Sequence, residues 1–138
     1  MSDSHVFVDT NILVYAHDLD AREKRETAKQ KVEMLWQAVY PPAISIQVLQ
    51  ELYVNLNKKK IAIETAQELV VGYLCWEVIE NSVELFKQSL DIQRRYKLSF
   101  WDSMIIAAAI KARAKEIWSE DLSHGQIFDG VEVVNPFK

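Results

Sequence analysis

The sequence predicts an α/β fold, with a central parallel sheet of about five short strands flanked by helices. Short apolar runs alternate with longer amphipathic segments from one end of the chain to the other. The 138 residues suffice for one domain with a core of its own, so we expect residues 1–138 to form a single domain. The expected strands lie near Val6 to Val8, Ala43 to Ser45, Cys75 to Ile79, Glu116 to Ser119 and Val131 to Val134.

Helical periodicity fills the segments between these strands. The longest expected helix runs from about Ala21 to Tyr40, where two prolines end it. Its expected apolar face consists of Ala28, Val32, Leu35, Trp36 and Val39. Another follows Ser82 as its cap, and we expect Val83, Phe86 and Leu90 to face inward. The remaining expected helices begin at Ile12 and span about Gln47 to Lys58, Glu64 to Val71 and Ser99 to Ala114.

The composition excludes several classes of function. Twenty acidic and sixteen basic side chains give a formal net charge of −4, which argues against a broad basic surface for long duplex DNA. Four local basic clusters are explained equally well as solvated helix faces and ends. They are Arg22 to Arg25, Lys58 to Lys60, Arg94 to Lys97 and Lys111 to Lys115. The chain has too few glycines for a nucleotide-cradling loop, and its histidines are too scattered for a zinc site.

The single cysteine and the N-terminus bear on the cellular compartment. Cys75 lies in an apolar stretch, and we expect a buried, reduced thiol. The N-terminus lacks a signal-peptide pattern, and no apolar run approaches the roughly 20 residues that a membrane span requires. We therefore expect a cytoplasmic protein with no membrane contact.

Acidic residues occur at the points where ligands collect in α/β proteins. Asp9 directly follows the first expected strand, and Asp121 follows the fourth. Asp102 opens a helix, and Glu51 lies beside the apolar stripe of another. Carboxylates gathered at one edge repel each other unless a cation is bound, and oxygen donors favour Mg²⁺ or Mn²⁺. The pattern thus predicts a divalent-cation site suited to phosphodiester hydrolysis.

Each of these acids also has an ordinary structural use. Asp9 can cap the helix that follows it, and Asp102 completes a capping box with Ser99. Asp121 can open a turn, and Glu51 can be a surface residue on its helix. Only their convergence distinguishes a site from these separate roles.

Four motifs resemble those of the PIN-domain ribonucleases and, within them, the VapC toxins of type II toxin–antitoxin pairs. In chain order they are Phe7-Val8-Asp9-Thr10-Asn11-Ile12-Leu13, Gln50-Glu51-Leu52-Tyr53, Leu98-Ser99-Phe100-Trp101-Asp102-Ser103 and Ser119-Glu120-Asp121-Leu122. The resemblance covers nearly the whole chain. It implies an endoribonuclease that depends on Mg²⁺ or Mn²⁺ and leaves a 5′-phosphate and a 3′-hydroxyl.

The resemblance also implies site residues. The family's catalytic quartet falls on Asp9, Glu51, Asp102 and Asp121. The metal ligands among them are Asp9, Asp102 and Asp121, while Glu51 holds the attacking water. The polar residues that orient metal and phosphate fall on Thr10, Asn11 and Ser119.

The expected partners are an RNA substrate, an antitoxin chain that covers the acidic pocket, and a second copy of this chain in a homodimer. Trp101, Tyr53 and Phe128 can stack on RNA bases, although burial in the core is an equally ordinary use of an aromatic ring. Apolar residues around Tyr53, Leu56 and the segment Ile61 to Tyr73 are candidate contact surfaces.

Two rival functions stay open at this stage. The first is a phosphatase or phosphotransferase with Asp9 as its nucleophile, but such enzymes usually carry a second Asp where this chain has Asn11. The second is a non-catalytic interaction module, or a receiver domain, whose acidic pocket regulates a partner. A receiver domain also needs a lysine after a late strand, and neither Ser119 to Asp121 nor Asn135-Pro136 supplies it.

Overall fold

Six short strands form one sheet in the order β3-β2-β1-β4-β6-β5 in the computed structural model, which describes residues 5–138. The strands are β1 (Val6–Val8), β2 (Ala43–Ser45), β3 (Glu77–Ile79), β4 (Glu116–Trp118), β5 (Ile127–Phe128) and β6 (Val131–Val134). Every neighbouring pair is parallel except β5 and β6. The predicted α/β fold with a central, mainly parallel sheet is confirmed.

The sheet differs from the prediction in two places. The strand expected at Cys75 begins at Glu77, because Leu74 and Cys75 form the turn that ends the preceding helix. β5 was not predicted: it has two residues and exists only as the antiparallel partner of β6. The hairpin turn at Asp129 and Gly130 has φ values of 47° and 90°, where glycine is the residue without steric cost.

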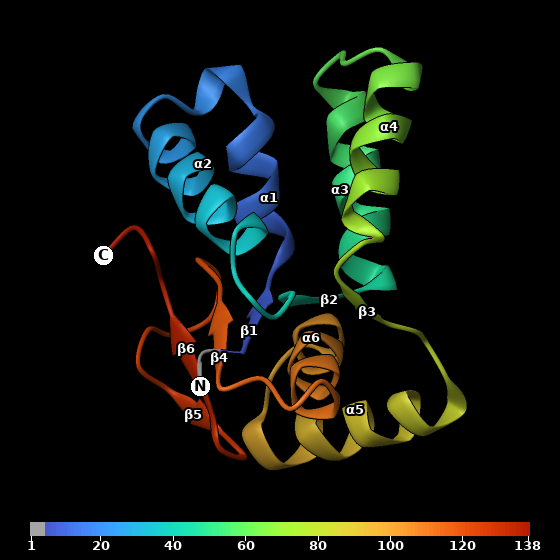
Figure 1. The fold of residues 1–138 in the computed structure, drawn as a ribbon. Helices are drawn as coiled ribbons and strands as arrows, with labels where there is room; N and C mark the ends of the chain where they lie inside the picture. The colour runs from blue at the N-terminus through green and yellow to red at the C-terminus, as the bar shows by residue number, and fades with distance from the viewer. Residues whose placement is uncertain (1–4) are drawn as a thin grey trace.

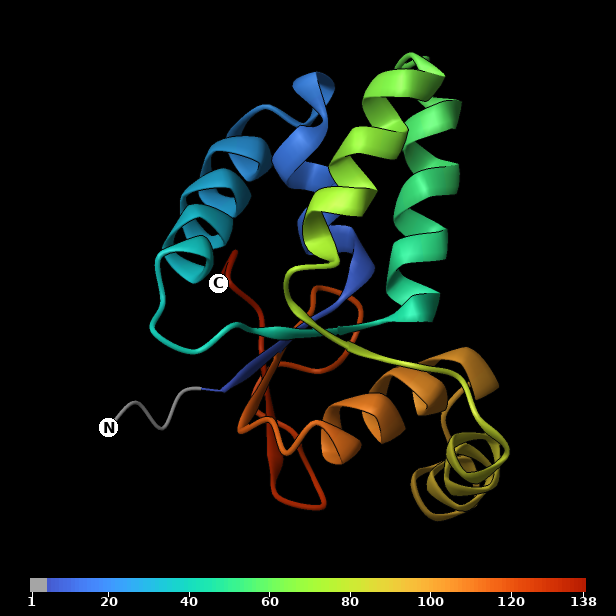
Figure 2. The same ribbon diagram turned by 45° about the vertical axis from the view of Figure 1, so that its right-hand side comes forward.

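Helices α1 to α4 gather at the top of the view and α5 and α6 lie below them, with β1, β2 and β3 between the two groups and β4, β5 and β6 at the lower left of Figure 1 (Figures 1 and 2). The helices are α1 (Thr10–His17), α2 (Glu23–Trp36), α3 (Ile46–Lys58), α4 (Ile63–Tyr73), α5 (Val83–Tyr96) and α6 (Phe100–Lys111), with a 3₁₀ turn at Leu19–Ala21. Within residues 5–138, no helix is both long and apolar enough to cross a membrane.

The long helix expected from Ala21 to Tyr40 is shorter than predicted. α2 ends at Trp36, and Val39, expected on its apolar face, is 87% exposed. Ala28, Val32 and Leu35 do face the core as predicted. Arg22, with φ of 56°, separates α2 from the preceding 3₁₀ turn.

The predicted inward face of α5 is wrong. Val83, Phe86 and Leu90 are 72%, 49% and 43% exposed. The helix instead buries Leu85, Ser89 and Ile92. Burial of Ser89 costs little because its hydroxyl donates to the Leu85 carbonyl oxygen at 2.8 Å.

Cys75 is exposed, contrary to the expected burial. It lies in the turn after α4, where the larger aromatic neighbours Tyr73 and Trp76 occupy the buried positions. The two rings pack edge to face with centroids 4.9 Å apart. Burying two large rings removes more apolar area from water than burying one thiol, so the thiol faces solvent.

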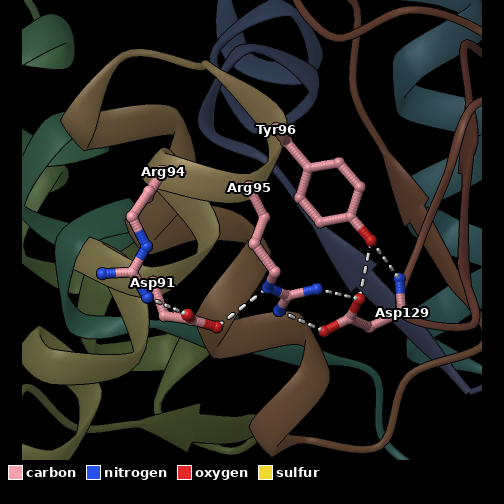
Figure 3. Close-up of polar contacts among 5 residues, drawn as sticks. All are labelled: Asp91, Arg94, Arg95, Tyr96 and Asp129. Carbon is pink, nitrogen blue, oxygen red and sulfur yellow. Dashed lines mark hydrogen bonds and ion pairs between the residues drawn. The ribbon is translucent and has the colours of Figure 1, made fainter.

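A polar network fastens α5 to the turn between β5 and β6 (Figure 3). Arg95 donates from both terminal nitrogens to the Asp129 carboxylate, at 2.8 and 2.7 Å, and from Nε to Asp91 at 2.9 Å. The Tyr96 hydroxyl donates to Asp129 at 2.6 Å. Because this turn precedes β6, which runs parallel to β4, the network lies at the amino edge of the parallel strands.

Candidate active site

Asp9 stands where β1 ends and α1 begins. Its backbone N–H donates to the Trp118 carbonyl oxygen at 2.9 Å, which ties the end of β1 to β4. Its Oδ1 accepts the Thr10 backbone N–H at 2.7 Å and caps α1, so the ordinary capping use is present. The residue is 6% exposed, which is unusual for a carboxylate without a cationic partner.

Ser119 joins Asp9 to the segment that carries Asp121. The Ser119 hydroxyl donates to Oδ2 of Asp9 at 2.8 Å and accepts the backbone N–H of Asp121 at 3.1 Å. Ser119 is fully buried directly after β4, and its own N–H donates to the Val134 carbonyl oxygen of β6. The hydroxyl therefore fixes the backbone of Asp121 relative to the carboxylate of Asp9.

Glu51 reaches the same place from α3. The Thr10 hydroxyl donates to Glu51 Oε1 at 2.6 Å, across 41 residues of sequence. Gln47, one turn earlier on α3, donates a longer bond of 3.4 Å to Oε2. Thr10 thus contributes its backbone N–H to one acid and its hydroxyl to the other.

A hollow of about 400 Å³ opens beside these groups. It is lined by Thr10, Asn11, Val14, Tyr15, Asp18, Glu51, Asn55, Lys59 and Asp121. Burial, with smaller contributions from the negative charges of Asp121 and Glu51, raises the pKa of Asp9 to about 6. The hydrogen bonds from Ser119 and Thr10 act in the opposite direction and lower it. The negative charges of Asp121 and Glu51 therefore act on Asp9.

Asp102 is not among the residues that line this hollow. It occupies the first turn of α6 and is half-buried, and Ser99 caps the helix by accepting the Asp102 backbone N–H at 3.1 Å. The link to the site runs through Gln47, which lies 3.4 Å from both the Trp101 carbonyl oxygen and Glu51 Oε2. Asp102 does not line the hollow, and its role in the site stays a prediction.

A network around Glu120 was not predicted from the sequence. The Glu120 carboxylate accepts from the Tyr15 hydroxyl at 2.6 Å and from Lys24 of α2. Its backbone N–H donates to Asn11 Oδ1 at 3.4 Å, while Nδ2 of Asn11 is buried without an acceptor. These contacts hold the segment from Ser119 to Asp121 against α1 and α2, and they occupy Glu120, leaving Asp121 as the acid of the pair that faces the hollow. No local pattern predicts them, because 96 to 109 residues separate the partners.

The donor chemistry fits a hard divalent cation, but not a closed cage. Across residues 5–138, no three His, Cys, Asp or Glu side chains are close enough together to form a metal cage. Within the same range, no lysine or arginine forms an ion pair with Asp9, Glu51 or Asp121. Mg²⁺ keeps several waters and is usually held by one or two carboxylates with substrate phosphates, so an open group of acids suits it.

The aromatic residues considered for base stacking differ in exposure. Phe128 is fully buried and cannot stack on RNA, whereas Trp101 is 62% exposed beside Asp102. Tyr53 is half-buried, and its hydroxyl accepts from Gln67 of α4 at 3.3 Å. Of the three rings, Trp101 is the one most available to a ligand.

Comparison with known proteins bears on the family and the fold. The PIN domain family model matches residues 6–127. The structure is similar to a toxin–antitoxin complex from Klebsiella pneumoniae, with a TM-score of 0.70 and 27% identity over 95% of this chain and 97% of that chain.

Two further solved structures share the fold at lower identity. VapC20 of Mycobacterium tuberculosis, a sarcin-ricin loop cleaving toxin, matches with a TM-score of 0.63 and 20% identity over 84% of this chain and 89% of that one. VapBC2 of Rickettsia felis, bound to a DNA fragment from its promoter, matches with a TM-score of 0.66 and 21% identity over 93% and 96%. No curated protein matches the sequence significantly.

Proposed function

The chain belongs to the PIN domain family, and from this premise we propose that it is a metal-dependent endoribonuclease acting as the toxin of a toxin–antitoxin pair. One observation carries the proposal: Asp9 is buried at the carboxyl edge of the sheet, in the company of Glu51 and Asp121 and without a cationic partner in residues 5–138. Such an arrangement costs folding free energy unless a cation joins it. The similarity to a toxin–antitoxin complex supports the toxin role.

In this proposal Asp9, Asp102 and Asp121 would hold Mg²⁺ or Mn²⁺, directly or through the waters that such a cation keeps. When bound, the cation lowers the pKa of a water and offsets the charge that grows on the phosphate oxygens. The protein supplies orientation: Ser119 and the Thr10 N–H fix the two oxygens of Asp9, so the carboxylate presents one face to the site. Thr10, Asn11 and Ser119 are the polar groups assigned to substrate and metal orientation.

Glu51 takes the proton of the attacking water. Its Oε1 is occupied by the Thr10 hydroxyl at 2.6 Å, whereas Oε2 has only the 3.4 Å contact with Gln47. Oε2 is therefore the oxygen with room to accept a proton. The short Thr10 bond fixes the direction in which that oxygen points.

The proposal is tested by RNA cleavage. Wild type, Asp9→Asn and the remote control Asp129→Asn are incubated with a mixed RNA pool in Mg²⁺, in Mn²⁺ and in EDTA. We expect cleavage by wild type and Asp129→Asn with either metal, products bearing 5′-phosphates, and none with EDTA or Asp9→Asn. Equal cleavage in all samples would reject the metal-dependent mechanism.

The rival phosphotransferase is separated by a trapping experiment. Both Asp9 oxygens already accept hydrogen bonds, from the Thr10 N–H and the Ser119 hydroxyl, which restrains the attack expected of a nucleophile. Recovery of an acid-stable aspartyl-phosphate on Asp9 after incubation with a phosphate donor would favour the rival. A failure of Mg²⁺ and Mn²⁺ to raise the melting temperature would favour a non-catalytic acidic-pocket module instead.

The proposed partners are RNA, an antitoxin and a second copy of this chain. Acids without cationic partners give an antitoxin Arg or Lys a place to bind. The exposed stripe Val83, Phe86 and Leu90 on α5 offers an apolar surface for a homodimer. In the surface suggested around Tyr53, Leu56 and the segment Ile61 to Tyr73, Leu56 and Tyr73 are buried in the core, whereas Ile63 and Val71 are 58% and 60% exposed and keep this segment a candidate contact surface. Sedimentation of wild type and Phe86→Glu tests the dimer, which the charged variant should lose.

A further inference from the structure

A second hollow adjoins the one beside Asp9. It has a volume of about 520 Å³ and is lined by His17, Asp18, Leu19, Asp20, Lys58, Lys59, Lys60 and Ile61. Asp18 and Lys59 line both hollows, and Lys59 Nζ lies 2.9 Å from Asp18 Oδ2. The ion pair therefore marks the boundary of one continuous groove between the end of α1 and the end of α3.

One face of α3 forms a wall of this groove. Glu51, Asn55 and Lys59 follow one another at intervals of four residues, and all three line the first hollow. Eight residues of helix span roughly 12 Å, so the acidic end and the lysine end of the groove are a few nucleotides apart. Lys60, with φ of 64°, turns the chain away just beyond the helix end.

The acidic end of this groove is electrostatically unfavourable for a polyanion. Asp18, Glu51 and Asp121 line the first hollow, and Lys59, its one cation, is already paired with Asp18. The whole chain has a formal net charge of −4, so general attraction for RNA is absent as well. Binding of an RNA strand needs local positive charge next to the cleavage site.

Lys58 and Lys60 differ from the cations that are already neutralised. Within the described residues neither forms an ion pair, whereas Lys24 is paired with Glu120, Arg95 with Asp91 and Asp129, and Lys111 with Glu84. Both are exposed and line the groove that leads from the acids. Their charges are thus free to act on a ligand lying in it.

We propose that Lys58 and Lys60 form a phosphate-binding subsite, which holds the backbone of the single-stranded RNA substrate as the strand leaves the acidic site along α3. The inference rests on the proposed nuclease function. The contacts are with phosphates, so the subsite contributes affinity without reading sequence. The ion pair between Lys59 and Asp18 lies between the acidic end of the groove and the end lined by Lys58 and Lys60.

The test compares two double variants of equal charge change. Lys58→Gln/Lys60→Gln removes the subsite, and Lys111→Gln/Lys115→Gln removes two lysines at the C-terminal end of α6 and just before β4. Each pair is placed in the Asp9→Asn background, and binding of a fluorescein-labelled single-stranded RNA of mixed sequence is followed by anisotropy from low to moderate salt. Thermal melts confirm folding.

We expect Lys58→Gln/Lys60→Gln to weaken binding about 5- to 10-fold at low salt and to reduce the salt slope by about 1.4, the value for two phosphate contacts on a single strand. The control pair should stay within about 2-fold. In the active enzyme the same change should raise KM with kcat nearly unchanged.

Two results overturn the subsite. Equal losses of RNA affinity in both double variants would show a general charge effect. An unchanged RNA affinity of Lys58→Gln/Lys60→Gln would show that these lysines do not bind the RNA backbone, and would point to an acidic protein segment as their ligand. Both outcomes leave the nuclease proposal standing if the wild type cleaves RNA. Absence of both RNA binding and RNA cleavage by the wild type would overturn the two proposals together.

Discussion

Asp9 at the carboxyl edge of the sheet and Asp129 at its amino edge are carboxylates in opposite electrostatic surroundings. Asp129 accepts from Arg95 and Tyr96, and these hydrogen bonds lower its pKa to about 2 (Figure 3). For Asp9, burial raises the pKa to about 6, with further contributions from Asp121 and Glu51. The neighbours of Asp129 stabilise its ionised form. Burial and the nearby negative charges destabilise the ionised form of Asp9.

The difference separates an acid that holds the fold together from one suited to chemistry. Asp129 needs nothing beyond the chain, because its charge is satisfied by α5. Asp9 is ionised at neutral pH only at a cost, which a bound cation removes. A buried carboxylate with a raised pKa, at the ligand-binding edge of an α/β sheet, is therefore the expected mark of a site.

The largest expected effect is on catalysis. Asp121→Asn should lower RNA cleavage by on the order of 100-fold or more, because it removes charge from the site. Asp129→Asn should retain cleavage within about 2-fold at a temperature where it is folded. Initial rates on a defined RNA give both values. Similar losses for the two variants would remove the functional distinction between the two ends of the sheet.

The next effect concerns cation binding. Saturating Mg²⁺ or Mn²⁺ at about 100 times its Kd should stabilise the wild type by about 2.7 kcal/mol. Asp9→Asn should lose most of this gain, while Asp129→Asn should keep it. Melting curves with and without metal measure the gain, and a metal-induced shift that survives in Asp9→Asn would place the cation elsewhere.

Without metal, the two aspartates should affect stability in opposite directions. The pKa of Asp9 lies above its ordinary value of 3.8, so stability should fall by up to about 3 kcal/mol as pH rises from about 4 to 6. Asp9→Asn should not show this fall in stability. Because the substitution also weakens the hydrogen bond that Ser119 donates to Asp9, the variant should be only about 1–2 kcal/mol more stable than wild type at pH 7.5.

Asp129 should act at lower pH. Its pKa lies below the ordinary value, so its contribution is present above about pH 4 and is lost as pH falls toward 2. Because the side chain is 34% exposed, Asp129→Asn should cost about 1 kcal/mol at neutral pH. Urea unfolding in EDTA between pH 3 and 8 follows both aspartates, and parallel profiles for the two variants would contradict their opposite surroundings.

The smallest effect is expected for Tyr96→Phe. The variant loses two hydrogen bonds with Asp129, the 2.6 Å bond from the hydroxyl to the carboxylate and the 3.2 Å bond that the Asp129 backbone N–H donates to the hydroxyl, but it keeps the ring, which packs edge to face on Phe128. Because Arg95 still pairs with Asp129, the loss should be about 0.5–1 kcal/mol in urea unfolding at pH 7.5. A cost above that of Asp129→Asn would mean that the hydroxyl has a role outside this network.

The fold was predictable where apolar runs are short and bounded, as in β1, β2 and β6, whose limits match the prediction residue for residue. The predicted inward face of α5 was wrong, because two faces of this helix carry apolar residues. The buried face contains Ser89, whose hydroxyl is satisfied by the Leu85 carbonyl oxygen. The prediction also failed on β5, since a two-residue strand exists only through its partner.

The candidate site was predictable only in part. Strand ends indicated Asp9 and Asp121, and the margin of an apolar helical stripe indicated Glu51. The structure brings Glu51 and Asp121 to one hollow, and their charges contribute to the raised pKa of Asp9. The contacts that orient them come from residues remote in sequence, such as Thr10 with Glu51 and Tyr15 with Glu120. These pairings are properties of the tertiary fold, and no spacing in the sequence encodes them.

The proposed cation site is tested most directly by a crystal of the protein soaked in Mn²⁺ and measured for anomalous scattering. We expect a peak between the Asp9 and Asp121 carboxylates, at roughly 2.0–2.6 Å from the oxygens that bind the ion, and we expect Asp9→Asn crystals to lack it. Strong anomalous density elsewhere on the molecule, with none at this edge of the sheet, would contradict it.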